Sequence, residues 1–383
     1  MATLHSVFTV SQPSRRLVDP SKLSSPAQAN EVYQTSWTSM IPSTRYTFVN
    51  DTHAAFQALQ QIFEEQWEEV DRQGLPHASV IVPTERLQHI SRLYREALLR
   101  QLENNPSPEE ASTVEAMSIV WHLFEVLTLP SRQPQPLVSE YLDWLNLSFP
   151  APSVKEGEEI STHDSPVDHP QFWPYLTRCL LRGHLDLVIS LLQHLLSATG
   201  SDSPDLSDDD TSLGLQAVSI AIEMVNGFPH RTRQTSTSQF HAHWQDWKSK
   251  CAHWATQCTE LSPLLKPLVD VFRILSGDTE CIRQHSHSWL ENLGATLLFN
   301  KPIADVNDLA DFLSDELPLP TEETGSMLDH TLLALIRQDR PTFIRYCSEI
   351  DDWLVTHAVD CLDKLGLLDD IDLTIDQSVR DYF

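Results

Sequence analysis

The sequence predicts a mostly α-helical protein, built as an irregular solenoid of stacked helical hairpins, and three observations support this fold class. Glycine is rare, at 10 of 383 residues, which argues against a turn-rich sandwich or barrel. Residues 172–195 contain two short apolar helices around a polar hinge, and such a hairpin must stack on neighbours to bury both apolar faces. Looser copies of this hairpin follow at uneven spacing, which indicates an irregular stack. The three hinges are Arg182-Gly183-His184, Gly277-Asp278 and Gln338-Asp339-Arg340.

The first part of the chain differs from the helical remainder. Residues 1–30 are rich in Ser and Pro and are expected to form a flexible arm. Residues 31–84 contain β-branched and aromatic runs at 32–37, 45–49 and 78–82, with a helix between the last two. A few short strands cannot form a stable sheet alone, and their unpaired edges need a partner sheet. The segment 31–84 is therefore predicted to be a β-blade that inserts into another protein.

Residues 85–383 are predicted to be the helical body, since apolar residues recur there at helical spacing. Its clearest pattern is an aromatic and cysteine seam that is fit to pack along a neighbouring helix: Phe240, Trp244, Trp247, Cys251, Trp254 and Cys258. Mobile loops are expected at 150–170 and 200–212. Helices are expected at 137–147, 172–195, 213–226, 240–258, 264–275, 279–299, 305–316, 326–337, 341–348 and 351–365.

Charge and composition restrict the partners. The chain has 26 Lys and Arg against 54 Asp and Glu, so its field repels phosphate backbones and anionic lipids. We therefore expect no direct nucleic-acid binding and no membrane insertion. No apolar run is long enough to span a bilayer, and the start lacks a signal peptide. The six cysteines form no CxxC pair and are interpreted as small core residues in a reducing compartment.

For each group of candidate chemical residues, a structural role explains the sequence pattern better than a chemical one. His241, His243 and His253 point away from the cysteine seam, so a zinc site there is disfavoured. Cys281 with His285 and His287 is a still weaker candidate. No phosphate-binding loop, HExxH or GxSxG motif is present. The sequence thus predicts no enzyme and no catalytic, cofactor-binding or metal residue. A helical metal-dependent enzyme around His357, Asp360 and Asp363 stays open as the less favoured alternative.

The order of the segments resembles one family, the eighty-five-kilodalton class of nucleoporins in the Y-shaped scaffold of the nuclear pore, which belongs to the ancestral coatomer element proteins. No single motif is sufficient for the match, which rests on the order and spacing of seven groups of residues between about residue 32 and 383. The motifs are Ala116–Trp121 with Glu125, Tyr141–Trp144, Phe172-Trp173 through Asp186, Trp244–Trp247 with Cys251, Leu275–Asp278 with Trp289, Leu328–Leu333, and Trp353–His357 with Asp360 and Asp363.

The resemblance implies a structural role at the nuclear pore of the nuclear envelope, in pore assembly, nucleocytoplasmic transport and mRNA export. It also implies a folded-back helical stack and a blade that completes the open propeller of a WD-repeat nucleoporin of the Sec-thirteen-homologue type. Other Y-complex nucleoporins are expected partners, partly through a C-terminal tail beyond residue 383, so the chain is expected to be truncated there. The residues expected to enter the propeller are Val32, Tyr33, Ser36, Trp37, Tyr46, Phe48, Val49, Val80 and Val82. A helical vesicle-coat or endomembrane scaffold is the alternative with the same architecture.

Overall fold

The structure is a computed structural model that describes residues 45–74, 84–104, 107–129, 136–163, 166–199, 208–229, 236–261, 263, 265–313, 319–321 and 323–368. The described residues are mostly helical and contain no β-strand, which confirms the predicted helical class. They belong to two compact units: unit 1 takes its residues from 1–134 and 320–383, and unit 2 from 135–319. Among the described helices, none is both long and apolar enough to cross a membrane.

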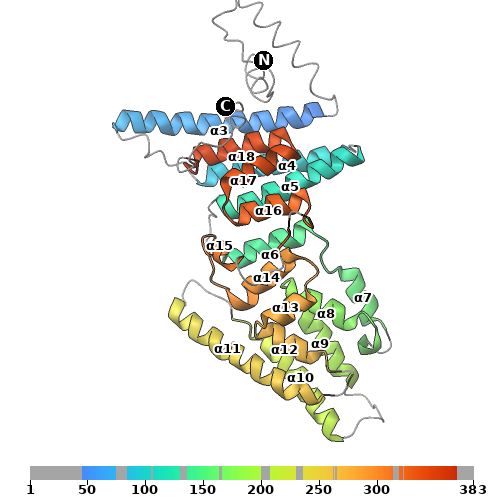
Figure 1. Ribbon diagram of the computed structural model, residues 1–383. Helices are drawn as coiled ribbons and strands as arrows, with labels where there is room; N and C mark the ends of the chain where they lie inside the picture. Colours follow the sequence, from blue (N-terminus) through green and yellow to red (C-terminus); the bar gives the residue numbers. More distant parts are fainter. Residues whose placement is uncertain are drawn as a thin grey trace, which may run out of the picture. The chain divides into compact units, whose positions relative to one another are not determined.

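Unit 1 contains helices from both ends of the described chain (Figure 1). The first three helices pack in order against one another, and the last three do the same. Each of the last three also contacts α5, so the chain folds back on itself within this unit, as the resemblance implied. The helices of unit 1 are α3 (Tyr46–Gln73), α4 (Thr84–Glu103), α5 (Pro108–Thr128), α16 (Met327–Ile336), α17 (Arg340–Ile350) and α18 (Asp352–Lys364).

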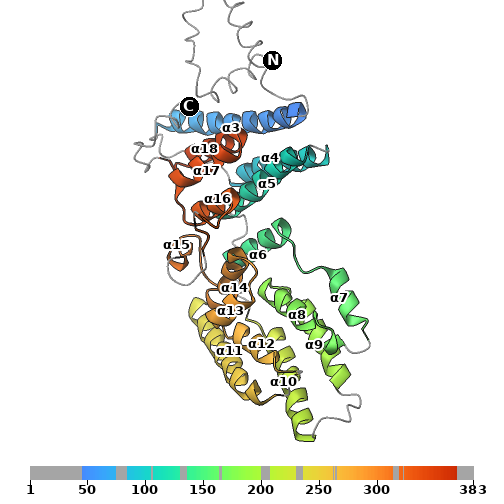
Figure 2. The same cartoon turned by 45° about the vertical axis from the view of Figure 1, so that its right-hand side comes forward.

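Unit 2 is built around α14, whose side chains are buried on almost every side, and which packs on α6, α8 and α13. Figure 2 shows α9 to α12 as neighbouring helices, in agreement with their contacts. Its helices are α6 (Leu137–Ser148), α7 (Val154–Ser161), α8 (Phe172–Leu181), α9 (Leu185–Thr199), α10 (Asp208–Asn226), α11 (Thr237–Gln257), α12 (Leu268–Leu275), α13 (Thr279–His285), α14 (Trp289–Asn300) and α15 (Leu309–Phe312), with short 3₁₀ turns at Pro166–Asp168 and Cys258–Glu260.

All three predicted hinges contain one residue with left-handed backbone: Gly183 (φ 77°), Gly277 (φ 76°) and Gln338 (φ 57°). At each hinge the following residue donates its N–H to the carbonyl five positions earlier, at 2.9 Å, 2.9 Å and 3.0 Å respectively. This is the Schellman pattern, which satisfies carbonyls that the helix end would leave open. The hinges therefore end α8, α12 and α16 and start α9, α13 and α17.

The predicted seam of α11 is confirmed as a packing face. Phe240, Trp244, Trp247 and Cys251 are buried, and the indole N–H of Trp247 donates to the Met224 carbonyl at 2.9 Å. All six cysteines lie in the described residues, where each is buried and free, in agreement with their interpretation as core residues.

The boundaries of several elements differ from the prediction. Within the expected loop 150–170, α7 forms because Ser153 caps it and because the Tyr175 hydroxyl donates to the Ser153 carbonyl at 2.9 Å. The helix expected at 279–299 is two helices, because the chain is extended at Ser286 and Ser288. Of the helix expected at 305–316, the described residues up to 313 contain the four-residue helix α15. In the expected loop 200–212, α10 already begins at Asp208.

The strand expected at 45–49 is wrong. Tyr46, Phe48 and Val49 form the first turn of α3, and Phe48 and Val49 are only 2% and 0% exposed within unit 1. A short apolar run of this kind does not distinguish a strand from a buried helix, and the contacts of the folded chain decide between them.

Candidate functional site

The start of α3 is fixed to the start of α18. The Arg45 guanidinium lies 3.0 Å from the Asp351 carboxylate, and the Phe48 ring meets the Trp353 ring edge-on with centroids 6.3 Å apart. Asp351 also caps α18 by accepting the Trp353 N–H at 2.9 Å. We name Arg45, Phe48, Asp351 and Trp353 the α3 anchor. It fixes the first turn of α3 against the first turn of α18.

A second contact holds α3 to α18 further along. The Gln60 amide donates to both oxygens of Asp360, at 3.0 Å and 2.9 Å. Burial raises the pKa of Asp360 to about 6, and the Gln60 hydrogen bonds oppose that shift. Near the end of α18, the Lys364 ammonium lies 4.9 Å from the centroid of the Phe63 ring. These contacts fasten the middle of α3 as well as its start.

His357 lies in the interior of unit 1 among aromatic rings. Its ring centroid is 4.4 Å from that of Tyr94 and 5.2 Å from that of Trp353. Neither of its ring nitrogens has a hydrogen-bond partner among the described residues. Burial, with a smaller effect from His53, lowers the pKa of His357 to about 3. His357 is therefore a neutral, flat packing residue near neutral pH.

The residues of the alternative metal enzyme do not gather into one site. His357 is buried between rings, Asp360 is held by Gln60, and Asp363 is exposed. The seam of α11 also fails as a zinc site, because Cys251 and Cys258 point inward while its histidines are exposed: His241, His243 and His253. Among the described residues, neither set converges on a point that a metal could occupy.

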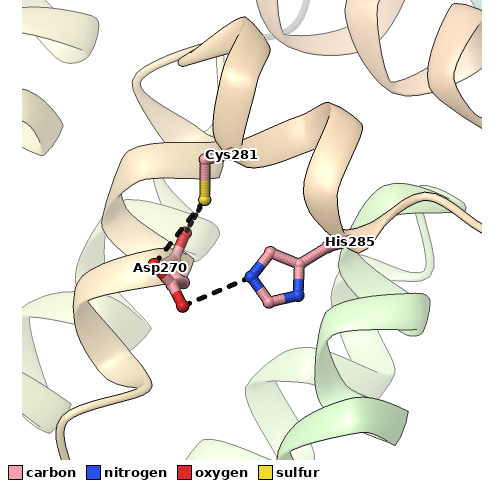
Figure 3. Close-up of side chains that lie close together, drawn as sticks. All are labelled: Asp270, Cys281 and His285. Carbon is pink, nitrogen blue, oxygen red and sulfur yellow. Dashed lines mark hydrogen bonds and ion pairs between the residues drawn. The ribbon is translucent and has the colours of Figure 1, made fainter. Parts of the chain in front are cut away.

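One group of possible metal ligands does come together, and it includes Asp270, which no sequence pattern marks. Cys281 and His285 on α13 face Asp270 on α12, across the Gly277 hinge (Figure 3). The His285 Nε2 lies 3.2 Å from Asp270 Oδ2, and the Cys281 Sγ lies 3.7 Å from Asp270 Oδ1. His287, which the sequence grouped with Cys281 and His285, instead lies beside Glu291 and is mostly exposed.

Unit 2 contains a buried ion pair inside the opening hinge of the repeat pattern. The Arg182 Nε donates to Glu291 Oε1 at 2.8 Å, and both side chains are less than one-tenth exposed. Arg182 also donates to the carbonyls of Leu145, at 3.1 Å, and Pro150, at 3.3 Å. The pair thus joins α14 to the α8–α9 hinge and to the end of α6. The Arg182–Glu291 pair therefore has a structural role within unit 2.

The structure separates the residues that were predicted to bind a partner. Six of them lie outside the described residues: Val32, Tyr33, Ser36, Trp37, Val80 and Val82. Tyr46, Phe48 and Val49 belong to α3, and the burial of Phe48 and Val49 inside unit 1 removes them as candidates for a partner's core. The other six residues stay a prediction, since they lie outside the described part of the chain.

Comparison with known proteins gives a consistent result. A family model described as Nup85 Nucleoporin matches residues 31–383. The chain is 26% identical over 333 residues to Nucleoporin nup85 of Schizosaccharomyces pombe, covering 80% of this chain and 48% of that protein. It is 24% identical over 355 residues to the human Nuclear pore complex protein Nup85, covering 87% of this chain and 50% of that protein. The chain therefore spans about half the length of these relatives.

Proposed function

The chain belongs to the Nup85 nucleoporin family, and from this premise we propose that it serves as a structural scaffold subunit of the nuclear pore complex at the nuclear envelope. The observation that carries this proposal is the family match, which extends over residues 31–383. The family is one of structural pore components, so the chain is assigned a scaffold role and not an enzymatic one. Its helices and buried polar contacts suit it to hold partners at fixed positions.

The test is the location of the protein in its own cells. A fluorescent fusion at the endogenous locus is expected to give a continuous rim at the nuclear envelope. Cytoplasmic puncta that coincide with a coat or endomembrane marker would favour the vesicle-coat alternative and contradict the proposal. Depletion is expected to reduce nuclear import and mRNA export together, because a scaffold supports every pathway through the pore.

We further propose that the chain binds a WD-repeat propeller nucleoporin through residues on either side of α3. The candidates are Val32, Tyr33, Ser36, Trp37, Val80 and Val82, which are β-branched or aromatic except for Ser36. An extended segment can add a strand to an exposed sheet edge, with alternate side chains entering the partner's core. The α3 anchor supports this proposal, because it would hold such a strand at a defined place on unit 1.

The length of α3 ranks these candidates. A helix of 28 residues is about 42 Å long, and the two candidate segments leave from its opposite ends. The eight residues from Trp37 to Arg45 reach about 27 Å at most, and the four from Gly74 to Ala78 about 14 Å. Both segments can meet in one sheet only when both connections are nearly extended. The connection of residues 32–37 to α3 is twice as long and reaches further, so we place the main contact there and a secondary one in 78–82.

Co-expression with the propeller tests the partner. Deletion of residues 31–44 is expected to abolish co-purification, while deletion of 1–30 is the matched control and is expected to leave it intact. The deletion stops at 44 because residues from 45 onward hold α3 in place. Retention of the propeller by the 31–44 deletion would exclude this mode of binding. Other Y-complex nucleoporins are further proposed partners, and the net charge of −28 disfavours direct contact with nucleic acid or lipid.

A further inference from the structure

The turn between α12 and α13 brings together three side chains of types that bind transition metals. Cys281 and His285 are four residues apart on α13, so both project from the same side of that helix. Asp270 projects from α12 toward them (Figure 3). One ligand atom from each residue can be chosen such that all three lie within 4.8 Å of one another. Within the described residues, this is the one group of three such side chains that meets this criterion.

Two contacts in this group, which go to the two different oxygens of Asp270, lie close to the edges of a tetrahedral zinc site. Zinc bonds of about 2.0–2.1 Å to nitrogen or oxygen and about 2.3 Å to sulfur place neighbouring ligand atoms roughly 3.3–3.6 Å apart. The His285 Nε2 to Asp270 Oδ2 distance is 3.2 Å, and the Cys281 Sγ to Asp270 Oδ1 distance is 3.7 Å. Since all three ligand atoms lie within 4.8 Å of one another, side-chain rotations alone would bring them around a common centre.

The backbone around the group is fixed in advance. Gly277 turns the chain between the two helices, and the Asp278 carboxylate accepts the Cys281 N–H at 3.0 Å. Asp278 is itself held by the Arg273 Nε at 2.9 Å. Arg273 also approaches Asp270 Oδ1, at 3.5 Å, but its closer partner is Asp278. The Arg273 charge can therefore stay on Asp278 while Asp270 binds a cation.

The donor set selects the metal and the coordination. Zinc binds thiolate and imidazole ligands well, whereas the hard cations magnesium and calcium prefer oxygen ligands. Cys281 is fully buried, whereas Asp270 and His285 are about one-third exposed, so a fourth position faces solvent. We propose that Asp270, Cys281 and His285 form a zinc-binding site that is completed by one water molecule. A Zn²⁺ ion with a thiolate, a carboxylate and a neutral imidazole carries no net charge.

Zinc binding changes the protonation of the group. Binding forms the Zn–S bond and releases the thiol proton to solvent, so zinc affinity rises with pH. The site would clamp α12 to α13 across the Gly277 hinge. This inference is independent of the proposed pore function, since it concerns the stability of one helical hairpin.

The test uses the purified chain, stripped of metal with a chelator. Zn²⁺ is titrated against a chromogenic chelator, and Co²⁺ is added separately as a spectroscopic probe. We expect one equivalent of bound Zn²⁺ and, with Co²⁺, a thiolate charge-transfer band together with the strong visible bands of a tetrahedral ion. Zn²⁺ is also expected to raise the melting temperature, because it binds the folded chain.

Variants assign the ligands. His285→Gln is expected to lower zinc affinity by more than about tenfold, and Cys281→Ala is expected to abolish the charge-transfer band. His285 is partly exposed, so its variant retains the fold even where Cys281→Ala does not. The matched control is His287→Gln, which removes a neighbouring exposed histidine and is expected to leave binding unchanged. Absence of stoichiometric zinc, or equal affinity in the His285 and His287 variants, would overturn the proposal.

Discussion

Two buried polar side chains, one in each unit, are accommodated in opposite ways. In unit 2, Arg182 and Glu291 are bonded to each other, and the remaining bonds of Arg182 go to main-chain carbonyls. In unit 1, both ring nitrogens of His357 are buried without a partner among the described residues. The first arrangement fixes segments far apart in sequence relative to one another. The second contributes only the apolar surface of a ring. Substitution of Arg182 should therefore lower the free energy of unfolding much more than substitution of His357.

The largest expected effect comes from breaking the Arg182–Glu291 pair. Arg182→Met leaves the Glu291 carboxylate buried with no opposite charge, which we expect to cost about 3–5 kcal/mol of unfolding free energy. Urea denaturation of the purified chain measures this loss. The control is Arg283→Met, which removes an exposed pair with Glu280 and should change stability by less than about 1 kcal/mol. Equal effects of the two variants would refute the role assigned to the buried pair.

The next largest effect is expected at the Gly277 hinge in unit 2. A Cβ at Gly277 would lie 2.8 Å from the Phe299 carbonyl oxygen, and a left-handed φ adds strain. Gly277→Ala should therefore cost about 2–4 kcal/mol. Gly183→Ala should cost only about 1–2 kcal/mol, because its Cβ meets the movable side chain of Leu142, at 3.0 Å. Thermal unfolding of both variants checks the order, and a reversed order would contradict this account.

Replacement of His357 should be harmless at neutral pH. His357→Leu keeps apolar packing and removes two unpaired nitrogens, so stability should stay constant or rise by up to about 1 kcal/mol. A loss comparable to that of Arg182→Met would remove the contrast between the units.

The same residue gives unit 1 a defined pH dependence. His357 has a pKa of about 3 when folded and an ordinary value of 6.5, so the unfolded chain alone binds this proton as pH falls below 6.5. This term lowers stability as pH falls from about 6.5 toward 3. Asp360 has the opposite effect, because its folded pKa of about 6 exceeds its ordinary value of 3.8. The folded chain therefore binds this proton first, and the free energy of unfolding rises as pH falls from about 6 toward 3.8. Between pH 7 and 5, His357→Leu should therefore lose less stability than the wild type, and Asp360→Asn should lose more. Parallel profiles would contradict both assignments.

The smallest expected effect is a gain at the hinge of unit 1. Gln338 has the same left-handed backbone as Gly183 and Gly277, with φ 57°. Gln338→Gly removes that strain and should stabilise the chain by about 0.5–1 kcal/mol, whereas Gln338→Ala should not. Denaturation midpoints of the two variants provide the comparison. A loss of stability on glycine substitution would show that this hinge differs from those of unit 2.

The hinges were predictable because their signals are local. A polar or glycine-containing break between two apolar periods specifies a helix end, and the structure places a left-handed residue at each one. Helix α7 was missed because tertiary contacts hold it, notably that between Tyr175 and Ser153. The start of α3 was missed for a similar reason, since Phe48 looks strand-like until Trp353 is brought against it.

The polar sites could not be predicted because their members are far apart in sequence. Glu291 is 109 positions from Arg182, and no local pattern connects them. An arginine inside an otherwise apolar hairpin was the available signal that a buried partner had to exist. Asp270 was overlooked beside Cys281 and His285 because the Gly277 turn, and not a shared helix face, brings it to them.

The most direct test of the proposed propeller binding is the affinity of two variants, measured by calorimetry with the purified WD-repeat nucleoporin that is proposed as the partner. The proposed main binding segment ends before residue 45, whereas the α3 anchor lies within unit 1. Trp37→Asp should abolish binding and leave the unfolding free energy unchanged. Phe48→Ala should lower stability by about 3–5 kcal/mol while the folded protein binds with unchanged affinity. Full binding by the Trp37 variant, or loss of binding by folded Phe48→Ala, would contradict the account.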